Sequence, residues 1–289
     1  MPNKFRPRIR SRHPSHSRLR SRYRLLPLMA FPSVIRLGST TELNDVKSRG
    51  GRRVELNTID SIKNSSSKLL MKTCFSSDGV KTADWWKINR NNTFTNMNTN
   101  EIIQKVELPF PIIAKSHFGS KGRGNTKLDN QIDMDAWLLG KNINGYIFEK
   151  FHNYAREYRL HVNSDGCFYT CRKMLKRDTE DDNKWFRNDA NCVWFLETNP
   201  GFDKPVNWNT VVEHSVKALK AVGLDFGAVD LRIEAANDGN GNKRTNPDFI
   251  VVEINSAPSF GDNNEVAPTK VFETYIKELP KMLYKKSLQ

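Results

Sequence analysis

Two stretches near the C-terminus place oxygen-bearing side chains inside apolar strands. The β-branched run 249–252 predicts a buried strand that leads into Glu253 and Asn255. Side chains alternate between the two faces of a strand, so Glu253 and Asn255 share one face. Residues 226–233 predict a second apolar strand, which contains Asp230. An ionised carboxylate there is costly unless a positive group meets it. These oxygens suit Mg²⁺; the alternative is two ordinary strands with acids at their solvated ends.

A glycine-rich loop follows another predicted strand, 108–115, which ends in Lys115. Glycines let backbone N–H groups approach phosphate oxygens closely, and lysines add positive charge. The spacing is not G-x-x-x-x-G-K-[ST], and no helix follows at once, so this is not the usual P-loop. The segment predicts a phosphate-binding hairpin loop, with an ordinary surface hairpin as the alternative. The candidate loop residues are Gly119, Ser120, Lys121, Gly122 and Gly124.

The metal-binding end of the ATP-grasp ligases is similar to two runs of this chain, Gly227-Ala228-Val229-Asp230 and Val252-Glu253-Ile254-Asn255-Ser256-Ala257-Pro258-Ser259. In that superfamily an acid on one strand and an E-x-N on the next hold Mg²⁺ against the phosphates of ATP, and Mn²⁺ is compatible with the same ligands. The chain departs from the family in the long separation between Asp230 and Glu253. Turn-forming residues 237–244 explain the separation as a long hairpin tip.

The resemblance implies roles for further residues over about 60–280. Segment 145–151 resembles the strand that reads the adenine edge, with Glu149 at the adenine amine. Region 172–188 resembles the ligases that add glutamate to a ribosomal protein. The implied nucleotide-binding residues are Lys68, Lys115, Gly119, Ser120, Lys121, Gly122, Gly124, Glu149, Lys150, Phe151, Glu157 and Lys173. The implied metal ligands are Asp230, Glu253 and Asn255, and the implied catalytic residues are Arg159, Arg187 and Asn188.

The function that the resemblance implies is ATP-dependent ligation of a carboxylate to an amine. The carboxylate attacks the γ-phosphate to give an acyl phosphate, and the amine then displaces phosphate. This route needs no protein nucleophile. The expected partners are a small-molecule or peptide carboxylate and an amine. The alternative is a nucleotide-binding or structural component that keeps the fold within a nucleoprotein assembly, such as that of a virus or phage.

The net charge of +14 is concentrated at the N-terminus. Residues 1–24 contain nine lysines and arginines and no acid. A solvated leader is one reading of this composition, and contact with nucleic acid or another polyanion is a second. The Arg- and Ser-rich leader also leaves organellar targeting open, although Pro7, Pro14 and Pro27 would break the amphipathic helix that a transit peptide needs.

The cysteines and the hydropathy of the sequence indicate in which cellular compartment the protein is expected. No apolar run approaches membrane-spanning length. There is no C-x-x-C pair, and Cys167 and Cys171 are four steps apart on a predicted strand, about 13 Å, which is too far for a disulfide. A reducing compartment, and hence a cytoplasmic location, is expected.

The expected fold class is α+β, an ATP-grasp fold in which two α+β subdomains sandwich ATP between antiparallel sheets. The expected division is a basic tail at 1–33, a reduced N-terminal α/β lobe at 34–108 and the ATP-grasp domain at 109–285. Within that domain, 109–150 forms the ATP-lid subdomain and 151–285 the metal-binding subdomain. Helices are expected after a cap at Ser65 or Ser66, after Asn130, from Asn209 and after Pro268.

Overall fold

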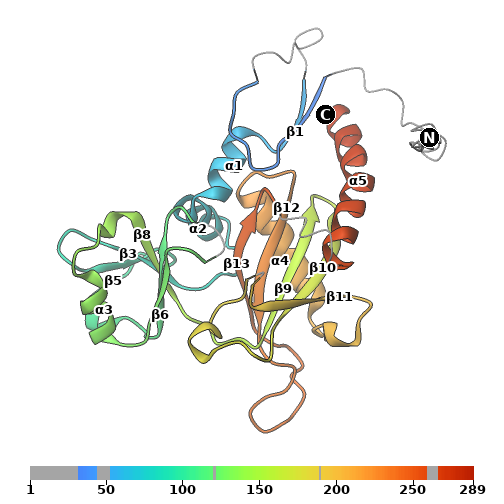
Figure 1. Ribbon diagram of the computed structural model, residues 1–289. Helices are drawn as coiled ribbons and strands as arrows, with labels where there is room; N and C mark the ends of the chain where they lie inside the picture. The colour runs from blue at the N-terminus through green and yellow to red at the C-terminus, as the bar shows by residue number, and fades with distance from the viewer. Residues whose placement is uncertain (1–31, 44–52, 120–121, 189, 259–265) are drawn as a thin grey trace, which may run out of the picture.

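The computed structural model describes residues 32–43, 53–119, 122–188, 190–258 and 266–289, with no side chains described for 266–269. The basic segment 1–24 and the loop residues Ser120 and Lys121 therefore lie outside the described residues. Figure 1 shows two sheets, one formed by β3 to β8 and the other by β9 to β13, with α1 and α2 beside them. The architecture is α+β, as the sequence predicts.

The first sheet has six strands in the order β5-β4-β3-β8-β6-β7, and every pair in it is antiparallel. The short helix α3 packs on it through Met134 and Trp137, which join the core formed around Trp86 and Phe148. The sheet includes strands from both sides of position 108, where the sequence suggested a domain boundary. Its elements are β3 (Trp85–Ile88), β4 (Phe94–Asn96), β5 (Ile102–Ile103), β6 (Ile112–Ser116), β7 (Asn125–Leu128), α3 (Gln131–Leu138) and β8 (Tyr146–Lys150).

The second sheet has five antiparallel strands in the order β11-β10-β9-β12-β13. Helix α4 covers one face, where Tyr158 and Leu160 of β9 meet Val211 and Leu219. Strand alternation predicts this face from the sequence of β9. The elements are β9 (Arg156–Asn163), β10 (Gly166–Leu175), β11 (Cys192–Leu196), α4 (Trp208–Ala221), β12 (Phe226–Ile233) and β13 (Phe249–Asn255).

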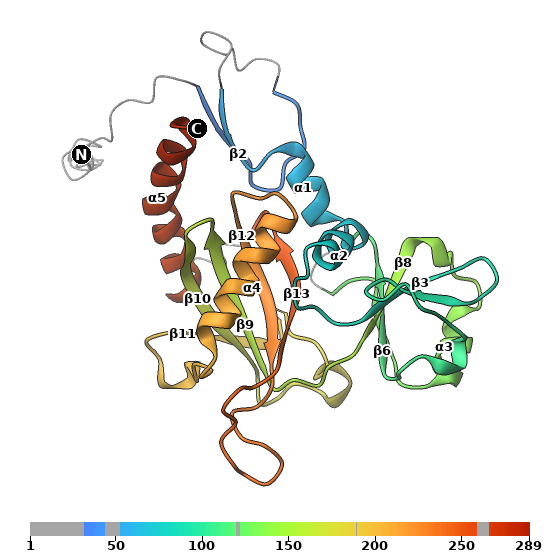
Figure 2. The same ribbon diagram turned by 180° about the vertical axis from the view of Figure 1, so that it is seen from behind.

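The N-terminal elements join the C-terminal helix in a third core. Strands β1 (Ser33–Ile35) and β2 (Val54–Leu56) are parallel, and β2 packs against α5 (Val266–Ser287) through Leu56, Tyr275 and Leu283. Figure 2 shows α5 standing beside β10 on the side of the sheet away from the β3–β8 group. The two ends of the chain's described part therefore stabilise one another.

Three helix boundaries differ from the sequence prediction, and one of them is the start of α5, which lies at Val266 and not after Pro268. Ser65 and Ser66 do not cap α2 (Lys68–Ser77); they end a preceding helix, α1 (Ile59–Ser66). Ser67 serves both helices, because its backbone N–H bonds to Lys63 at the end of α1 and its hydroxyl accepts from Leu70 N in α2. The predicted cap at Asn130 is confirmed, since its side chain accepts from Asp133 N. Helix α4 starts at Trp208, one residue before the predicted Asn209.

A long hairpin joins β12 to β13 and extends away from both sheets in Figure 1. Its base is closed where Glu234 N donates to Asp248 O at 2.9 Å, and its tip by a bridge between Asn237 and Lys243. This explains the separation of Asp230 from Glu253 as the sequence suggested. Val251, near the start of β13, forms a parallel bridge with Thr82, which ties the segment before β3 to the second sheet.

The remaining expectations concern cysteines and membranes. All four cysteines are free thiols, in line with the predicted absence of a bond between Cys167 and Cys171. Within the described ranges, no helix is both long enough and apolar enough to cross a membrane.

Candidate functional site

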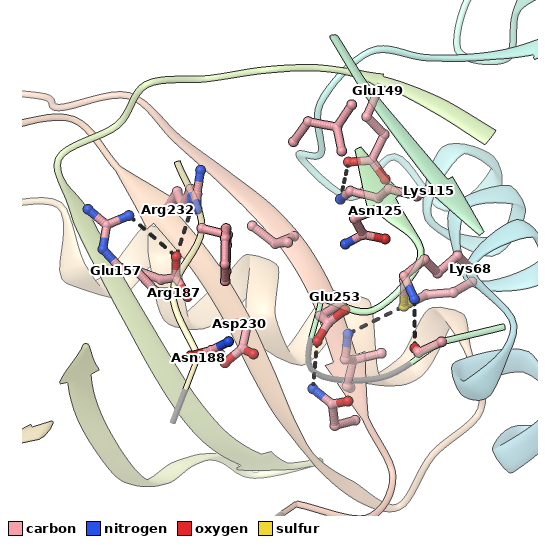
Figure 3. A pocket seen from close by; sticks show the side chains of 18 of the residues that line it. Lys68, Lys115, Asn125, Glu149, Glu157, Arg187, Asn188, Asp230, Arg232 and Glu253 are labelled. Atoms are coloured by element: carbon pink, nitrogen blue, oxygen red, sulfur yellow. Dashed lines mark hydrogen bonds and ion pairs between the residues drawn. The ribbon is translucent and has the colours of Figure 1, made fainter. Parts of the chain in front are cut away.

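A cavity of about 580 Å³ lies between the two sheets and gathers side chains from both. Figure 3 shows Lys68 and Lys115 on one side of it and Glu157, Arg187 and Arg232 on the other. Most of the sequence-predicted residues line this cavity, although they come from widely separated parts of the chain. They are Lys68, Lys115, Gly119, Gly122, Glu149, Lys150, Phe151, Glu157, Arg159, Lys173, Arg187, Asn188, Asp230, Glu253 and Asn255. Gly124 is not among the lining residues.

Lys68 and Lys115 bring positive charge to the glycine-loop side of the cavity. Lys68 opens α2, and its Nζ donates to the carbonyl oxygen of Gly119 at 2.8 Å. Burial lowers the pKa of Lys68, an effect that the nearby Glu253 carboxylate partly opposes. Lys115 Nζ donates to Glu149 Oε2 at 2.7 Å. A cation in the first turn of a helix works against the helix dipole, so the position of Lys68 is explained better by the cavity than by helix stability.

The positions of the loop require glycine for different structural reasons. Gly122 and Gly124 have φ angles of +79° and +78°, which favour glycine. Gly119 is constrained by space, because a methyl group there would lie 2.6 Å from the carbonyl oxygen of Arg123. The chain therefore passes too close to itself at Gly119 to admit any larger residue, and this close turn places the Gly119 carbonyl at Lys68.

Replacing Gly119 should damage the loop without unfolding the protein. If the loop binds the phosphates of ATP as the sequence predicts, we expect Gly119→Ala to shift the loop backbone and weaken ATP binding about tenfold, with a small change in melting temperature, because a contact of 2.6 Å with backbone must be relieved. Gly239→Ala is the matched control, since a methyl group there has no neighbour within 4 Å. Titration calorimetry of both variants checks this. Equal ATP affinity in the two variants would show that the loop conformation does not matter for binding.

Asp230 and Glu253 face one another across neighbouring strands. They are paired in the register of β12 and β13, and the register then shifts so that Leu231 pairs with Val251. The residue passed over is Val252, an irregularity of the kind that re-aims side chains near active sites. Asn255 Nδ2 donates to Glu253 Oε1 at 3.2 Å. The two strands therefore deliver the predicted oxygen ligands to one wall of the cavity.

Asp230 is already engaged by two cations. Arg159 of β9 donates Nε and Nη2 to its two oxygens, both at 2.8 Å, and Lys173 of β10 lies 3.0 Å from Oδ2. Burial opposes ionisation of Asp230, but these two cations hold its pKa well below the usual range. The charge of this buried carboxylate is therefore met by protein groups, which the sequence could not indicate.

The donor set suits a hard cation at the half-buried pair Glu253 and Asn255, since both side chains line the cavity and offer oxygens. Asp230 fits as a third ligand by its position beside Glu253, but a metal there would share it with Arg159 and Lys173. Among the described residues, no three His, Cys, Asp or Glu side chains cluster to hold a metal, and the proposed set contains two carboxylates and an amide.

Glu157 is the second buried carboxylate of the cavity. Lys173 Nζ and Arg232 Nε each approach one of its oxygens at 3.0 Å, and Arg187 lies 3.6 Å away. Burial opposes its ionisation, yet Lys173 and Arg232 lower its pKa. Arg232 is not among the site residues predicted from the sequence, although its spacing signals the role: it lies two residues after Asp230 on a strand and so shares its face.

The cavity also has an apolar and aromatic compartment. Trp185 and Phe186 lie in the loop before β11 and pack edge to face, with ring centroids 4.9 Å apart. They line the cavity with Phe151, Ile113 and Ile250, which come from both sheets. Such a compartment suits a flat, weakly polar ring. The carboxylate of Glu149, expected at the adenine amine, is in contact with Lys115 and Lys72.

Comparison with known proteins identifies the fold. No protein-family model matches the chain, and no curated protein is similar to it in sequence. Among solved structures, D-alanine–D-alanine ligase from Bacillus anthracis matches with a TM-score of 0.53 and 16% identity, over 81% of this chain and 71% of that one. The chain has the ATP-grasp fold. At 16% identity the likeness shows the fold and leaves the chemistry to the residues of the cavity.

Two further ATP-grasp structures match over a similar extent. The Bacillus anthracis ligase complexed with ATP matches with a TM-score of 0.54 and 16% identity, over 82% of this chain and 70% of that one. The D-alanine–D-alanine ligase from Coxiella burnetii matches with a TM-score of 0.52 and 12% identity, over 82% of this chain and 62% of that one.

Proposed function

We propose that this protein is an ATP- and Mg²⁺-dependent ligase that joins a carboxylate to an amine. The observation that carries the proposal is a cavity between the two sheets, where a glycine loop, two lysines and an E-x-N strand meet. Its described lining has more cationic than anionic side chains. The cations are Lys68, Lys115, Lys150, Arg159, Lys173, Arg187 and Arg232, and the anions are Glu149, Glu157, Asp230 and Glu253. A surplus of positive charge suits a polyphosphate ligand and an acidic substrate.

The proposed reaction has two steps. An oxygen of the substrate carboxylate attacks the γ-phosphorus of ATP, the bond from this phosphorus to the β,γ-bridging oxygen breaks, and ADP leaves. The product is an acyl phosphate. The amine then attacks the acyl carbon, phosphate leaves with the electron pair of the C–O bond, and the amine loses a proton. Phosphoryl transfer of this kind depends mainly on positioning and charge neutralisation.

The position of each residue in the cavity suggests which part of the ligands it would bind. Lys68, Lys115 and the glycine loop are suited to hold the phosphates, and the aromatic compartment around Phe151 is suited to the adenine. Glu253, Asn255 and Asp230 would hold Mg²⁺ or Mn²⁺, which neutralises phosphate charge when bound. The substrate carboxylate would meet the arginine side of the cavity, where Arg187 lies next to Glu157 and Asn188 also belongs to the lining.

Two measurements test the proposal in sequence. MgATP at millimolar concentration should raise the melting temperature, because a ligand that binds only the folded state stabilises it. ADP should then be released when MgATP is supplied with pooled amino acids or peptides. A folded sample that shows no shift with MgATP contradicts the nucleotide site. A shift without ADP release under any substrate pool favours the nucleotide-binding component instead.

A further inference from the structure

A third lysine lies behind the phosphate side of the cavity. Lys72 follows Lys68 by one helical turn on α2, and only 1% of its surface is exposed. Its Nζ lies 3.4 Å from Glu149 Oε1 and donates to the hydroxyl of Thr82, which in turn donates to Val251 O at 2.8 Å. Lys72 does not line the cavity, whereas Lys115 and Glu149 both do.

Two buried lysines therefore share one buried carboxylate. Lys115 holds Glu149 Oε2 and Lys72 faces Oε1, and all three side chains are less than a tenth exposed. Without Lys72, the Glu149 carboxylate and the Lys115 ammonium would form an isolated pair with no net charge. With Lys72, the three groups together carry one positive charge. Electrostatic interactions are weakly screened in a buried cluster. A ligand held by Lys115 would therefore experience the difference between a neutral cluster and one with a single positive charge.

We propose that Lys72 is a positioning residue for nucleotide binding. Its positive charge neutralises the Glu149 carboxylate, and the positive charge of Lys115 is then available to the phosphates. The inference rests on the proposed nucleotide site and adds a residue outside the cavity. Burying a lysine ammonium costs free energy, so packing alone does not explain a lysine at this position. Its ammonium is anchored on three elements, through Glu149 of β8, Thr82 before β3 and, behind Thr82, Val251 of β13.

The arrangement also implies a dependence on pH. Burial lowers the pKa of Lys72 to about 8, against the attraction of Glu149 and with further lowering by Lys115. The other charged groups in its surroundings are Glu253 on β13 and Lys68 on the same helix. Above this pKa, Lys72 is neutral, and Glu149 then cancels Lys115. Phosphate affinity should therefore be full at pH 7 and fall as the pH rises towards 9.

The decisive experiment compares ATP with adenosine, which lacks phosphates, by titration calorimetry. We expect Lys72→Met to weaken ATP binding about tenfold, as loss of one weakly screened charge implies, and to leave adenosine binding unchanged. The double variant Lys72→Met/Glu149→Gln should recover the wild-type ratio of ATP to adenosine affinity, because Lys115 is again uncancelled. Lys63→Met is the matched control, since it removes the same charge from an exposed site on α1.

Each other outcome overturns the inference. Lys72→Met that binds ATP as tightly as the wild type removes the electrostatic role, and equal losses for ATP and adenosine indicate a packing role. A double variant that stays as weak as Lys72→Met contradicts the cancellation by Glu149. The wild-type pH profile needs no variant: ATP affinity that is flat from pH 7 to 9 also sinks the proposal. A wild type that binds no ATP rejects the proposed function itself.

Discussion

Glu253→Gln should lower the rate of ADP release about a hundredfold or more while the protein stays folded. The substitution removes a full negative charge from the predicted metal position and hardly changes the side-chain volume. Neutralisation of phosphate charge by a bound metal contributes several kcal/mol to catalysis. Folding should survive, because a glutamine oxygen at position 253 can still accept the 3.2 Å hydrogen bond from Asn255. Loss of charge repulsion with the neighbouring Asp230 favours the folded state slightly.

The measurement is steady-state ADP release together with a denaturation midpoint for each variant. Asn255→Asp should be milder, because the side-chain oxygen is kept. Glu213→Gln on the exposed side of α4 is a control for the loss of one carboxylate. Wild-type turnover by Glu253→Gln would remove the metal assignment and with it the main support for the ligase. Reduced stability with unchanged turnover would mean a purely structural acid.

Asp230→Asn should, in contrast, lower stability as well as turnover. Its carboxylate is the anion for both Arg159 and Lys173, and all three groups are largely buried. Removing one partner of a buried ion pair leaves uncompensated charge, which costs about 3 kcal/mol or more. The free energy of unfolding from urea titration at pH 7 measures this loss. Asp182→Asn, at an exposed position before β11, makes the same chemical change and should show no comparable loss.

The dependence of stability on acid pH gives a second test of the ion pairs that Asp230 makes with Arg159 and Lys173. The pKa of Asp230 is held below its ordinary value of 3.8 by Arg159 and Lys173, with burial opposing them. A depressed folded-state pKa gives stability that is present above the unfolded value and is lost as the pH falls towards the folded one. The wild type should therefore lose this part of its stability below about pH 4, and Asp230→Asn should lack it at every pH. Parallel acid profiles for the two proteins would contradict the ion-pair geometry.

The sequence predicts those features that depend on local periodicity. Alternation along 156–162 separates Glu157 and Arg159 from the buried Tyr158 and Leu160, and the structure confirms this division. The strands around Asp230 and Glu253 are also where the pattern puts them. By contrast, α1 was missed because its eight residues hold only two isoleucines among polar side chains. Its helical signal comes from caps and from burial of Ile62 against the rest of the core.

Features that depend on strand order could not be predicted. Lys173 reaches Asp230 only because β9 lies between β10 and β12, an order that no local pattern encodes. The last helix shows the same limit. The apolar pattern of this helix predicts a buried face that contains Val271, Phe272, Tyr275, Ile276 and Leu279. In the structure Val271 and Tyr275 are buried, but Phe272 and Ile276 are 51% and 47% exposed. Helix α5 packs on one side, against β2 and its neighbours, so the real buried face is narrower than the apolar pattern.

The hairpin between β12 and β13 offers a place for insertions. Between the base and the tip Arg244 N donates to Ala236 O, and at the base Glu234 N donates to Asp248 O. These bonds fix the register of Asp230 with Glu253 independently of the tip, and a side chain added at Gly239 or Gly241 would meet no neighbour within 4 Å. Exposed loop tips of this kind tolerate added sequence. A fluorescent label or an affinity peptide inserted at 239–240 would therefore report on the protein from a position remote from the cavity.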